Sequence, residues 1–291
     1  MLEILKKIDF IKEKKLNITK IDEKTFSLKN SKEKYILNLF PYGKYVKLKR
    51  NYECLKTISI EFKDLLIYEE IGVICDKICY RIIKDIKDEK KSFNQEDSYK
   101  IGFEIGKFIN RFHKYFQSED CGRWYKHYNY RINRLLHEYG LGKYRGELDY
   151  IIFDFLEENK YCLKDRTCTT IMGIDSICDI IISKNKKFQI LEEYKILRSD
   201  SFFEFRNMNL NYKGNECLLT GIINGYFNGK VPRNFFKLLG VYTITEDLYG
   251  IFSKYDQVGF EYINNKIKSI IDAYDGFSNI YPVWYLKNKK F

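Results

Sequence analysis

The chain has 291 residues, of which 45% are hydrophobic and 17% aromatic, and its formal net charge is +11. This length allows two lobes with substantial cores or one large domain, and the apolar content excludes a disordered chain. The basic residues are spread along the chain and alternate with acidic ones, as in the segment 84–91. A nucleic-acid-binding surface would need clustered basic residues with interleaved aromatic ones, so we expect no nucleic-acid partner.

The cysteines and the N-terminal segment indicate the cellular compartment. Eight cysteines occur without a Cys-x-x-Cys pair, and the three histidines supply no zinc-finger spacing, so we expect buried free thiols. The segment 1–7 is charged throughout and does not resemble a signal peptide. No apolar run approaches membrane-spanning length. These features predict a cytoplasmic protein without a membrane partner.

Short strands and one helix dominate the first part of the chain. Leu5, Ile8 and Ile11 recur at helical spacing and predict a short amphipathic helix. Apolar runs separated by polar turn residues predict strands at 16–21, 25–28, 34–40, 66–68 and 73–83. A longer helix is expected at 45–62, with an apolar face made by Leu48, Tyr52, Leu55 and Ser59.

The pattern becomes helical after a charged connector at 84–91. Apolar residues from Ile101 to Phe112 form a helical stripe that ends near His113, and further helices are expected at 129–139, 148–156 and beyond 201. The runs 177–183 and 187–191 predict a β-hairpin. Strands followed by a connector and helices predict an α+β fold of two lobes. We expect a β-rich lobe at 1–83, a connector at 84–91 and a helical lobe at 92–291.

An ordered set of segments resembles a known family. The run Ser-Asp-Ser-Phe-Phe-Glu-Phe at 199–205 is similar to the Gly-Asp-Pro-Trp-Glu-Glu-Phe segment of aminoglycoside phosphotransferase-like proteins of low-GC bacteria. Segment 102–106 with Phe112 and His113 resembles the family's helix that ends in Leu-x-x-Ile-His. Further matching segments lie at 225–227, 231–232, 235–239, 241–242, 272–275 and 282–285. The resemblance implies a two-lobed protein-kinase-like fold with a β-rich N-terminal lobe and a mainly helical C-terminal lobe.

The resemblance also implies ATP and Mg²⁺ as cofactors. In such phosphotransferases a basic strand residue neutralises the nucleotide phosphates and pairs with a helix glutamate. Here Asn38 occupies the basic position and Glu53 the glutamate position, so the resemblance assigns both to the cofactor-binding site. Lys34 lies on the same strand face as Asn38. It is four residues away, about 13 Å along the strand, and cannot replace the missing basic group.

The catalytic loop of the family aligns with residues 172–181. The family's His-Gly-Asp motif matches Met-Gly-Ile at 172–174, so Ile174 replaces the catalytic aspartate. Asp175 is the nearest acid and the candidate catalytic residue, although it lies one position late. Asp179 stands where the family has an asparagine, and Glu192 stands where it has an aspartate. The resemblance therefore implies a metal site made by Asp179 and Glu192.

Three replacements, at Asn38, Met172 and Ile174, decide the functional interpretation. They favour a divergent aminoglycoside phosphotransferase-like protein that binds a small molecule, nucleotide or protein partner without efficient phosphoryl transfer, which is a pseudokinase. The alternative is an active ATP-dependent phosphotransferase of small molecules, in which Asp175 or Asp179 takes an altered role. A nucleic-acid-binding protein is the third class, and the dispersed charge argues against it.

Overall fold

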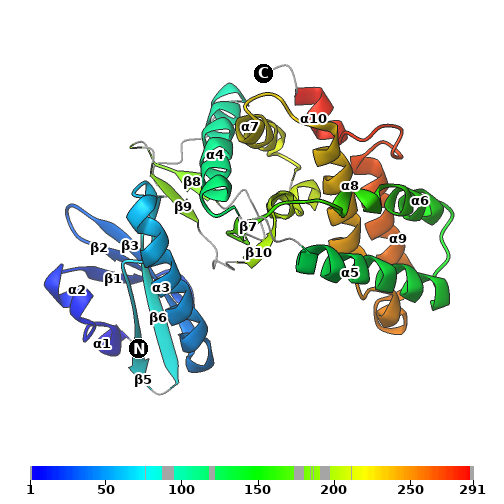
Figure 1. Ribbon diagram of the computed structural model, residues 1–291. Coiled ribbons are helices and arrows are strands. Elements are labelled where there is room, and N and C mark those ends of the chain that lie inside the picture. The colour runs from blue at the N-terminus through cyan, green and yellow to red at the C-terminus, as the bar shows by residue number, and fades with distance from the viewer. Residues whose placement is uncertain are drawn as a thin grey trace. The chain divides into compact units, whose positions relative to one another are not determined.

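The computed structural model divides into two compact units (Figure 1). Unit 1 comprises Met1–Ser92 and Ile180–Tyr194, and unit 2 comprises Phe93–Asp179 and Lys195–Phe291. The structure describes residues 2–75, 77–86, 95–117, 122–173, 180–183, 185, 187–190, 197–210 and 212–288. The expected α+β class, with a β-sheet in the N-terminal region and mainly helices in the C-terminal region, is confirmed. The lobe limits at 1–83, 84–91 and 92–291 stay a prediction.

Unit 1 is built on a five-stranded antiparallel sheet with the strand order β1-β2-β3-β6-β5. The strands are β1 (Asn17–Lys20), β2 (Thr25–Lys29), β3 (Lys34–Pro41), β5 (Glu70–Cys75) and β6 (Ile78–Lys84). The helices are α1 (Leu2–Leu5), α2 (Asp9–Glu13) and α3 (Tyr45–Glu61). A second sheet has the order β4-β9-β8 and consists of β4 (Leu65–Leu66), β9 (Phe188–Ile190) and β8 (Ile180–Ile182).

Two expected elements of unit 1 differ in the structure. The expected helix around Leu5 and Ile11 is broken, because Ile8 has extended backbone angles (φ −63°, ψ 126°) and separates α1 from α2. The single strand expected at 73–83 is a hairpin in which Cys75 pairs with Ile78. Both sides of this hairpin are rich in apolar residues, so hydrophobicity alone does not reveal the reversal of the chain.

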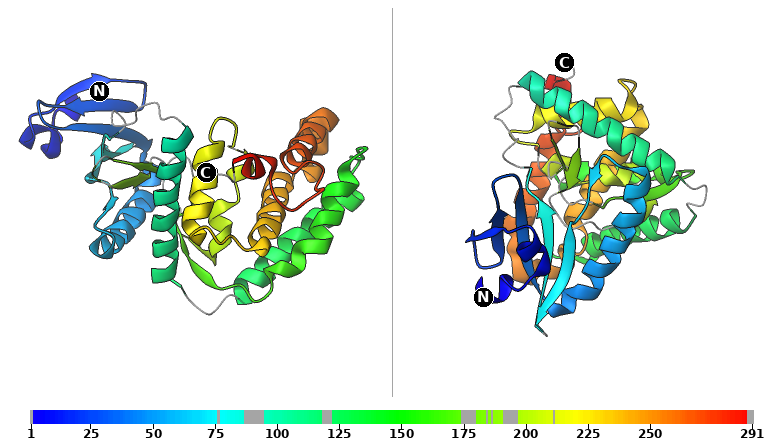
Figure 2. Two further views of the ribbon diagram at one scale, coloured as in Figure 1. Left: turned by 90° about the horizontal axis from the view of Figure 1, so that it is seen from above. Right: turned by 90° about the vertical axis from the view of Figure 1, so that its left-hand side faces the viewer.

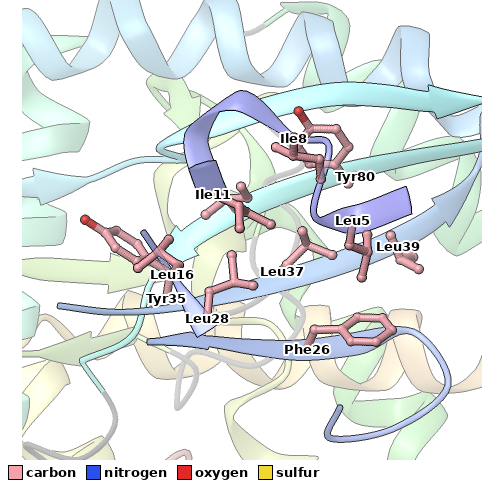
Figure 3. Packing of buried hydrophobic residues seen from close by; sticks show 11 residues of the cluster. Leu5, Ile8, Ile11, Leu16, Phe26, Leu28, Tyr35, Leu37, Leu39 and Tyr80 are labelled. Atoms are coloured by element: carbon pink, nitrogen blue, oxygen red, sulfur yellow. The ribbon is translucent and has the colours of Figure 1, made fainter. Parts of the chain in front are cut away.

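The core of unit 1 lies between the two short N-terminal helices and one face of the five-stranded sheet (Figure 3). Leu37 and Leu39 of β3 are buried there with Leu5 of α1 and Ile11 of α2. Successive side chains of a strand point to opposite faces. Asn38, between the two leucines, therefore points to the opposite face of the sheet.

Helices make up most of unit 2 (Figure 1). They are α4 (Gln95–Tyr115), α5 (Gly122–Leu141), α6 (Asp149–Asn159), α7 (Glu216–Phe227), α8 (Arg233–Leu248), α9 (Tyr255–Ala273) and α10 (Val283–Asn288). Two strands that the sequence did not predict, β7 (Cys168–Ile171) and β10 (Leu197–Asp200), form an antiparallel pair. The 3₁₀-helix η5 (Ser201–Phe205) continues directly from β10. This pair leads the chain into and out of the part that holds the expected catalytic loop.

Most cysteines whose thiols the structure describes agree with the expectation. Cys79, Cys162 and Cys217 carry buried free thiols as predicted, and Cys54 carries a free thiol that is only half-buried. Cys168 is disulfide-bonded, so the expectation of a free thiol is wrong at this position. Among the described helices, none combines the length and apolar character that crossing a membrane requires.

Helices α4 and α7 lie side by side and approach each other at glycines (Figure 2). A Cβ atom on Gly106 would lie 2.1 Å from the carbonyl oxygen of Ile222. A Cβ atom on Gly225 would lie 2.0 Å from the carbonyl oxygen of Phe103. Both distances are far below van der Waals contact, and the clashing atoms belong to the backbone. Only glycine allows the two helices to pack this closely.

We predict that Gly106→Ala destabilises the protein by about 3 kcal/mol, because the methyl group forces the two helix backbones apart. Gly140→Ala is the matched control, since Gly140 lies in α5 with open space around it. The control substitution is expected to stabilise by about 0.5–1 kcal/mol through helix propensity. Urea unfolding followed by far-ultraviolet circular dichroism measures both. Equal effects of the two substitutions would show that α4 and α7 tolerate separation.

Candidate functional site

A buried guanidinium group lies on the face of the sheet that carries Asn38. Arg81 of β6 is the direct cross-strand partner of Asn38 in β3 and is only 7% exposed. Its Nε donates a hydrogen bond to Oδ1 of Asn38 (3.3 Å), and its Nη1 donates one to the hydroxyl of Tyr68 (3.4 Å). The sequence placed a neutral residue at the family's basic position. The structure places a basic residue on the next strand, directly beside it.

Aromatic rings fix the orientation of this guanidinium. Cζ of Arg81 lies 5.5 Å from the ring centroid of Phe40 and 5.2 Å from that of Tyr68. Tyr68 in turn stacks on Tyr52 of α3, with 6.2 Å between ring centroids. Cation–π contacts contribute about 0.5–2 kcal/mol each, depending on burial. The position of Arg81 is thus set by two strands, the segment before β5 and α3.

Two further residues of unit 1 were considered for the nucleotide site, Glu53 as a cofactor-binding residue and Lys34 as an excluded substitute for the missing basic group. Glu53 lies on the exposed side of α3, and within the described part of the chain its carboxylate forms neither a hydrogen bond nor an ion pair. Nζ of Lys34 lies 3.2 Å from Oδ2 of Asp85 at the end of β6. Lys34 is therefore engaged in an ion pair, in agreement with its exclusion as a phosphate ligand. The assignment of Asn38 and Glu53 to cofactor binding stays a prediction.

The expected catalytic and metal-binding residues lie outside the described residues. These are Ile174, Asp175, Asp179 and Glu192. Within the ranges that the structure describes, no group of three or more His, Cys, Asp or Glu residues could hold a metal ion. The metal site of Asp179 and Glu192 and the catalytic role of Asp175 therefore stay predictions.

A buried polar network anchors the residue that begins the expected catalytic loop. The backbone N–H of Met172 donates to Oε2 of Glu204 (2.7 Å), a residue of η5 that is 2% exposed. The same oxygen lies 3.4 Å from Nε2 of His113. Nδ1 of His113 lies 2.9 Å from the hydroxyl of Tyr226, and the hydroxyl of Thr169 donates to the backbone oxygen of His113 (2.7 Å). The start of the loop is thus tied to α4, α7, β7 and η5.

A second buried group in unit 2 is the ion pair of Arg166 and Asp200. The guanidinium donates from Nε and Nη2 to the two carboxylate oxygens, both at 2.9 Å. The carboxylate is fully buried and also accepts hydrogen bonds from the hydroxyl of Tyr242 (2.6 Å) and the backbone N–H of Phe202 (3.0 Å). Such a bidentate geometry combines charge with directional hydrogen bonding.

The pKa values of Arg166 and Tyr242 are both shifted by their buried surroundings. Burial lowers the pKa of the Arg166 guanidinium, but the hydrogen bonds and charge of Asp200 raise it more, so the net shift is upward. Burial, followed by the charge of Asp200, raises the pKa of the Tyr242 hydroxyl well above its usual range. Tyr242 therefore stays a neutral donor to the carboxylate. The pair joins the segment before β7 to η5 and α8.

Sequence reasoning found some of these residues only as part of a resemblance. Asp200 and Glu204 both lie in the segment 199–205, which was matched to the family without a role for either residue. His113 was matched in the same way at the end of its helix. Sequence reasoning missed Arg81 and Arg166. Arg81 is revealed only by its strand register opposite Asn38, and no local sequence pattern surrounds Arg166.

Comparison with known proteins shows which solved structures share this fold. No protein-family model matches the chain, and no curated protein matches its sequence. The solved aminoglycoside phosphotransferase APH(4)-Ia is similar over 96% of this chain and 100% of its own, with TM-score 0.57 and 12% identity. A choline/ethanolamine kinase family protein from Mesorhizobium loti is similar over 99% and 97%, with TM-score 0.56 and 8% identity.

A third solved structure, the ADP-bound aminoglycoside phosphotransferase APH(2'')-Ib, is similar over 92% of this chain and 96% of its own, with TM-score 0.52 and 12% identity. At such identities the likeness concerns the fold. This chain therefore has the protein-kinase-like fold of these phosphotransferases, which confirms the expectation drawn from the segments around 199–205.

We predict that Asp200→Asn destabilises the protein by about 3–5 kcal/mol, because it leaves the Arg166 guanidinium in a buried place without its counter-charge. The control is Asp256→Asn, the same chemical change in an exposed ion pair, in which Oδ1 of Asp256 lies 2.7 Å from Nζ of Lys143. An exposed pair contributes less than about 1 kcal/mol. Chemical unfolding of both variants tests this, and a loss below 1 kcal/mol for Asp200→Asn would contradict it.

Proposed function

We propose that this chain is a divergent aminoglycoside phosphotransferase-like protein that binds a nucleotide through unit 1 and transfers phosphoryl groups poorly. The observation that carries the proposal is the buried Arg81 guanidinium beside Asn38. Neighbouring strands lie about 4.8 Å apart, so the positive charge is displaced by one strand from the position that the family uses. A planar guanidinium suits phosphate oxygens at least as well as a lysine ammonium.

The cofactors of this proposal are ATP and Mg²⁺. The similar structure of APH(2'')-Ib holds ADP, which supports a nucleotide as the ligand of this fold. Arg81 fits the phosphates because it supplies the cation that Asn38 lacks. The proposal gives Mg²⁺ to Asp179 and Glu192, whose oxygen ligands suit a hard divalent cation. In this proposal Asn38 orients the guanidinium through its hydrogen bond. Glu53 of α3 remains the residue at the family's glutamate position in the cofactor-binding site.

Poor transfer follows from the catalytic loop and from the displaced cation. Loss of a general base costs about 10²–10⁴ in rate, and Ile174 cannot accept a proton. The aromatic contacts of Arg81 also hold its charge at one strand's distance from the family position, and errors of about 1 Å already cost roughly a hundredfold. Nucleotide binding is thus retained more fully than transition-state stabilisation. The protein would act as a pseudokinase with a small-molecule or protein partner in the cytoplasm.

The alternative is an active phosphotransferase of small molecules in which Asp175 or Asp179 accepts the proton. The anchored start of the loop at Met172 supports this alternative, because its backbone N–H is bound by Glu204, which in turn contacts His113. Turnover measurements separate the two readings.

We predict that Arg81→Gln weakens ATP binding at least tenfold, since the positive charge at the phosphates is lost. Arg81→Lys retains the charge without the fork geometry and should lose less affinity. Lys29→Gln removes the same charge from an exposed position of β2 and is the matched control. Calorimetric titration with ATP, with and without Mg²⁺, gives the dissociation constants. Equal ATP affinity in wild type and Arg81→Gln, with native circular dichroism, would refute the role of Arg81.

We predict negligible ATP turnover by the wild type, with or without an aminoglycoside. Ile174→Asp alone should recover little activity, because catalytic groups that act together are strongly non-additive. The triple variant Ile174→Asp, Asn38→Lys and Arg81→Asn restores the base and moves the cation to the family position. Its gain in ATP turnover should exceed the product of the gains of the separate substitutions. Steady-state ATP hydrolysis measures this. Robust wild-type turnover that Asp175→Asn abolishes would establish the alternative.

A further inference from the structure

A cavity of about 550 Å³ lies within unit 2, lined by α5, the β7–β10 pair and η5. Its basic lining residues are Arg123, His127, Arg131 and Arg198. No aspartate or glutamate is among the described residues that line it. Clefts lined by one sign of charge focus the electrostatic field and raise the local concentration of ions of the opposite charge. The cavity therefore favours an anion.

The remaining wall of the cavity is largely aromatic. Trp124 stacks on Tyr128 with 5.2 Å between ring centroids, and Phe203 meets both rings edge-on at 4.8 and 5.6 Å. Tyr128 is buried, and burial raises the pKa of its hydroxyl well above the usual range, so this wall carries no negative charge. Such a surface accepts a planar or apolar molecular body.

The basic side chains of α5 differ in whether they form ion pairs within the protein. Nη2 of Arg131 lies 2.9 Å from Oε1 of Glu246, so this charge is neutralised within the protein. Arg123 and His127 are one helical turn apart on the same face of α5, and both are exposed. Within the described part of the chain, neither side chain forms a hydrogen bond or an ion pair. Arg123 thus presents its full charge at the cavity.

We propose that this cavity binds a small anionic compound, with a phosphate or carboxylate group held by Arg123 and a planar or apolar body against Trp124 and Phe203. The compound would be a substrate or a regulatory ligand of unit 2, and this role rests on the proposed function above. Strand β7 connects Cys168 in the cavity wall to Met172 at the start of the catalytic loop, about 13 Å along the chain. A polycation such as an aminoglycoside, or a quaternary ammonium compound, would meet like charge here.

The test is calorimetric titration of the full chain without nucleotide or Mg²⁺. The probes are phenyl phosphate, benzoate, inorganic phosphate, benzyl alcohol, choline and kanamycin. We expect saturable binding of phenyl phosphate or benzoate, and the tighter of these two identifies the anionic group. Inorganic phosphate should bind more weakly because it lacks the ring, and benzyl alcohol because it lacks the charge.

The matched variants are Arg123→Gln and Lys126→Gln, which remove one charge each from exposed positions of α5, with only Arg123 in the cavity wall. Arg123→Gln should weaken the anion about tenfold, as expected for loss of a charge-assisted contact, and Lys126→Gln less than twofold. Equal affinities in the two variants, no binding of either aromatic anion by the wild type, or tight binding of kanamycin or choline overturns the proposal. If ATP binds in a manner that depends on Arg81 but the aromatic anions do not bind, only this inference is refuted. If the aromatic anions bind but ATP does not, only the proposed function is refuted.

Discussion

The ion pair of Arg166 and Asp200 is the interaction on which the polar interior of unit 2 depends. A buried charge costs several kcal/mol unless its partner is close and its hydrogen-bonding capacity is used. Asp200 meets this requirement through Arg166, Tyr242 and the N–H of Phe202. It thereby fixes η5, which carries Glu204 to the backbone of Met172. Met172, at the beginning of the expected catalytic loop, is thus held by a residue that lies four positions after the buried charge of Asp200.

The sequence predicts the fold where the hydrophobic pattern is long and one-sided. Helix α4 shows such a stripe, and residues such as Ile105 and Phe108 are buried as expected. Strands β7 and β10 have only four residues each, too few for a period to emerge from the pattern. The β5–β6 hairpin could not be predicted for another reason, because its apolar run continues on both sides of the turn. Length and alternation, rather than composition, thus decide which elements can be predicted.

The candidate site shows the same limit at the level of single residues. Asn38 and Glu53 were located because the resemblance assigns a strand and a helix to each, and both elements are present. Arg81 could not be located, because it meets Asn38 across 43 residues of chain through the register of two strands. The contact of Arg166 with Asp200 similarly spans 34 residues. Contacts that depend on the register of two strands therefore cannot be read from a local sequence motif.

The division of the chain into units has a consequence for biosynthesis. The segment Ile180–Tyr194 belongs to unit 1, although it follows a large part of unit 2 in the chain. A ribosome therefore releases β1 to β6 long before β8 and β9, and the edge of β4 has no partner strand during that time. Helix α4 likewise waits for α7, since 113 residues separate His113 from Tyr226. Unit 1 therefore becomes complete only when Tyr194 has been synthesised, after Phe93–Asp179 of unit 2 has already left the ribosome.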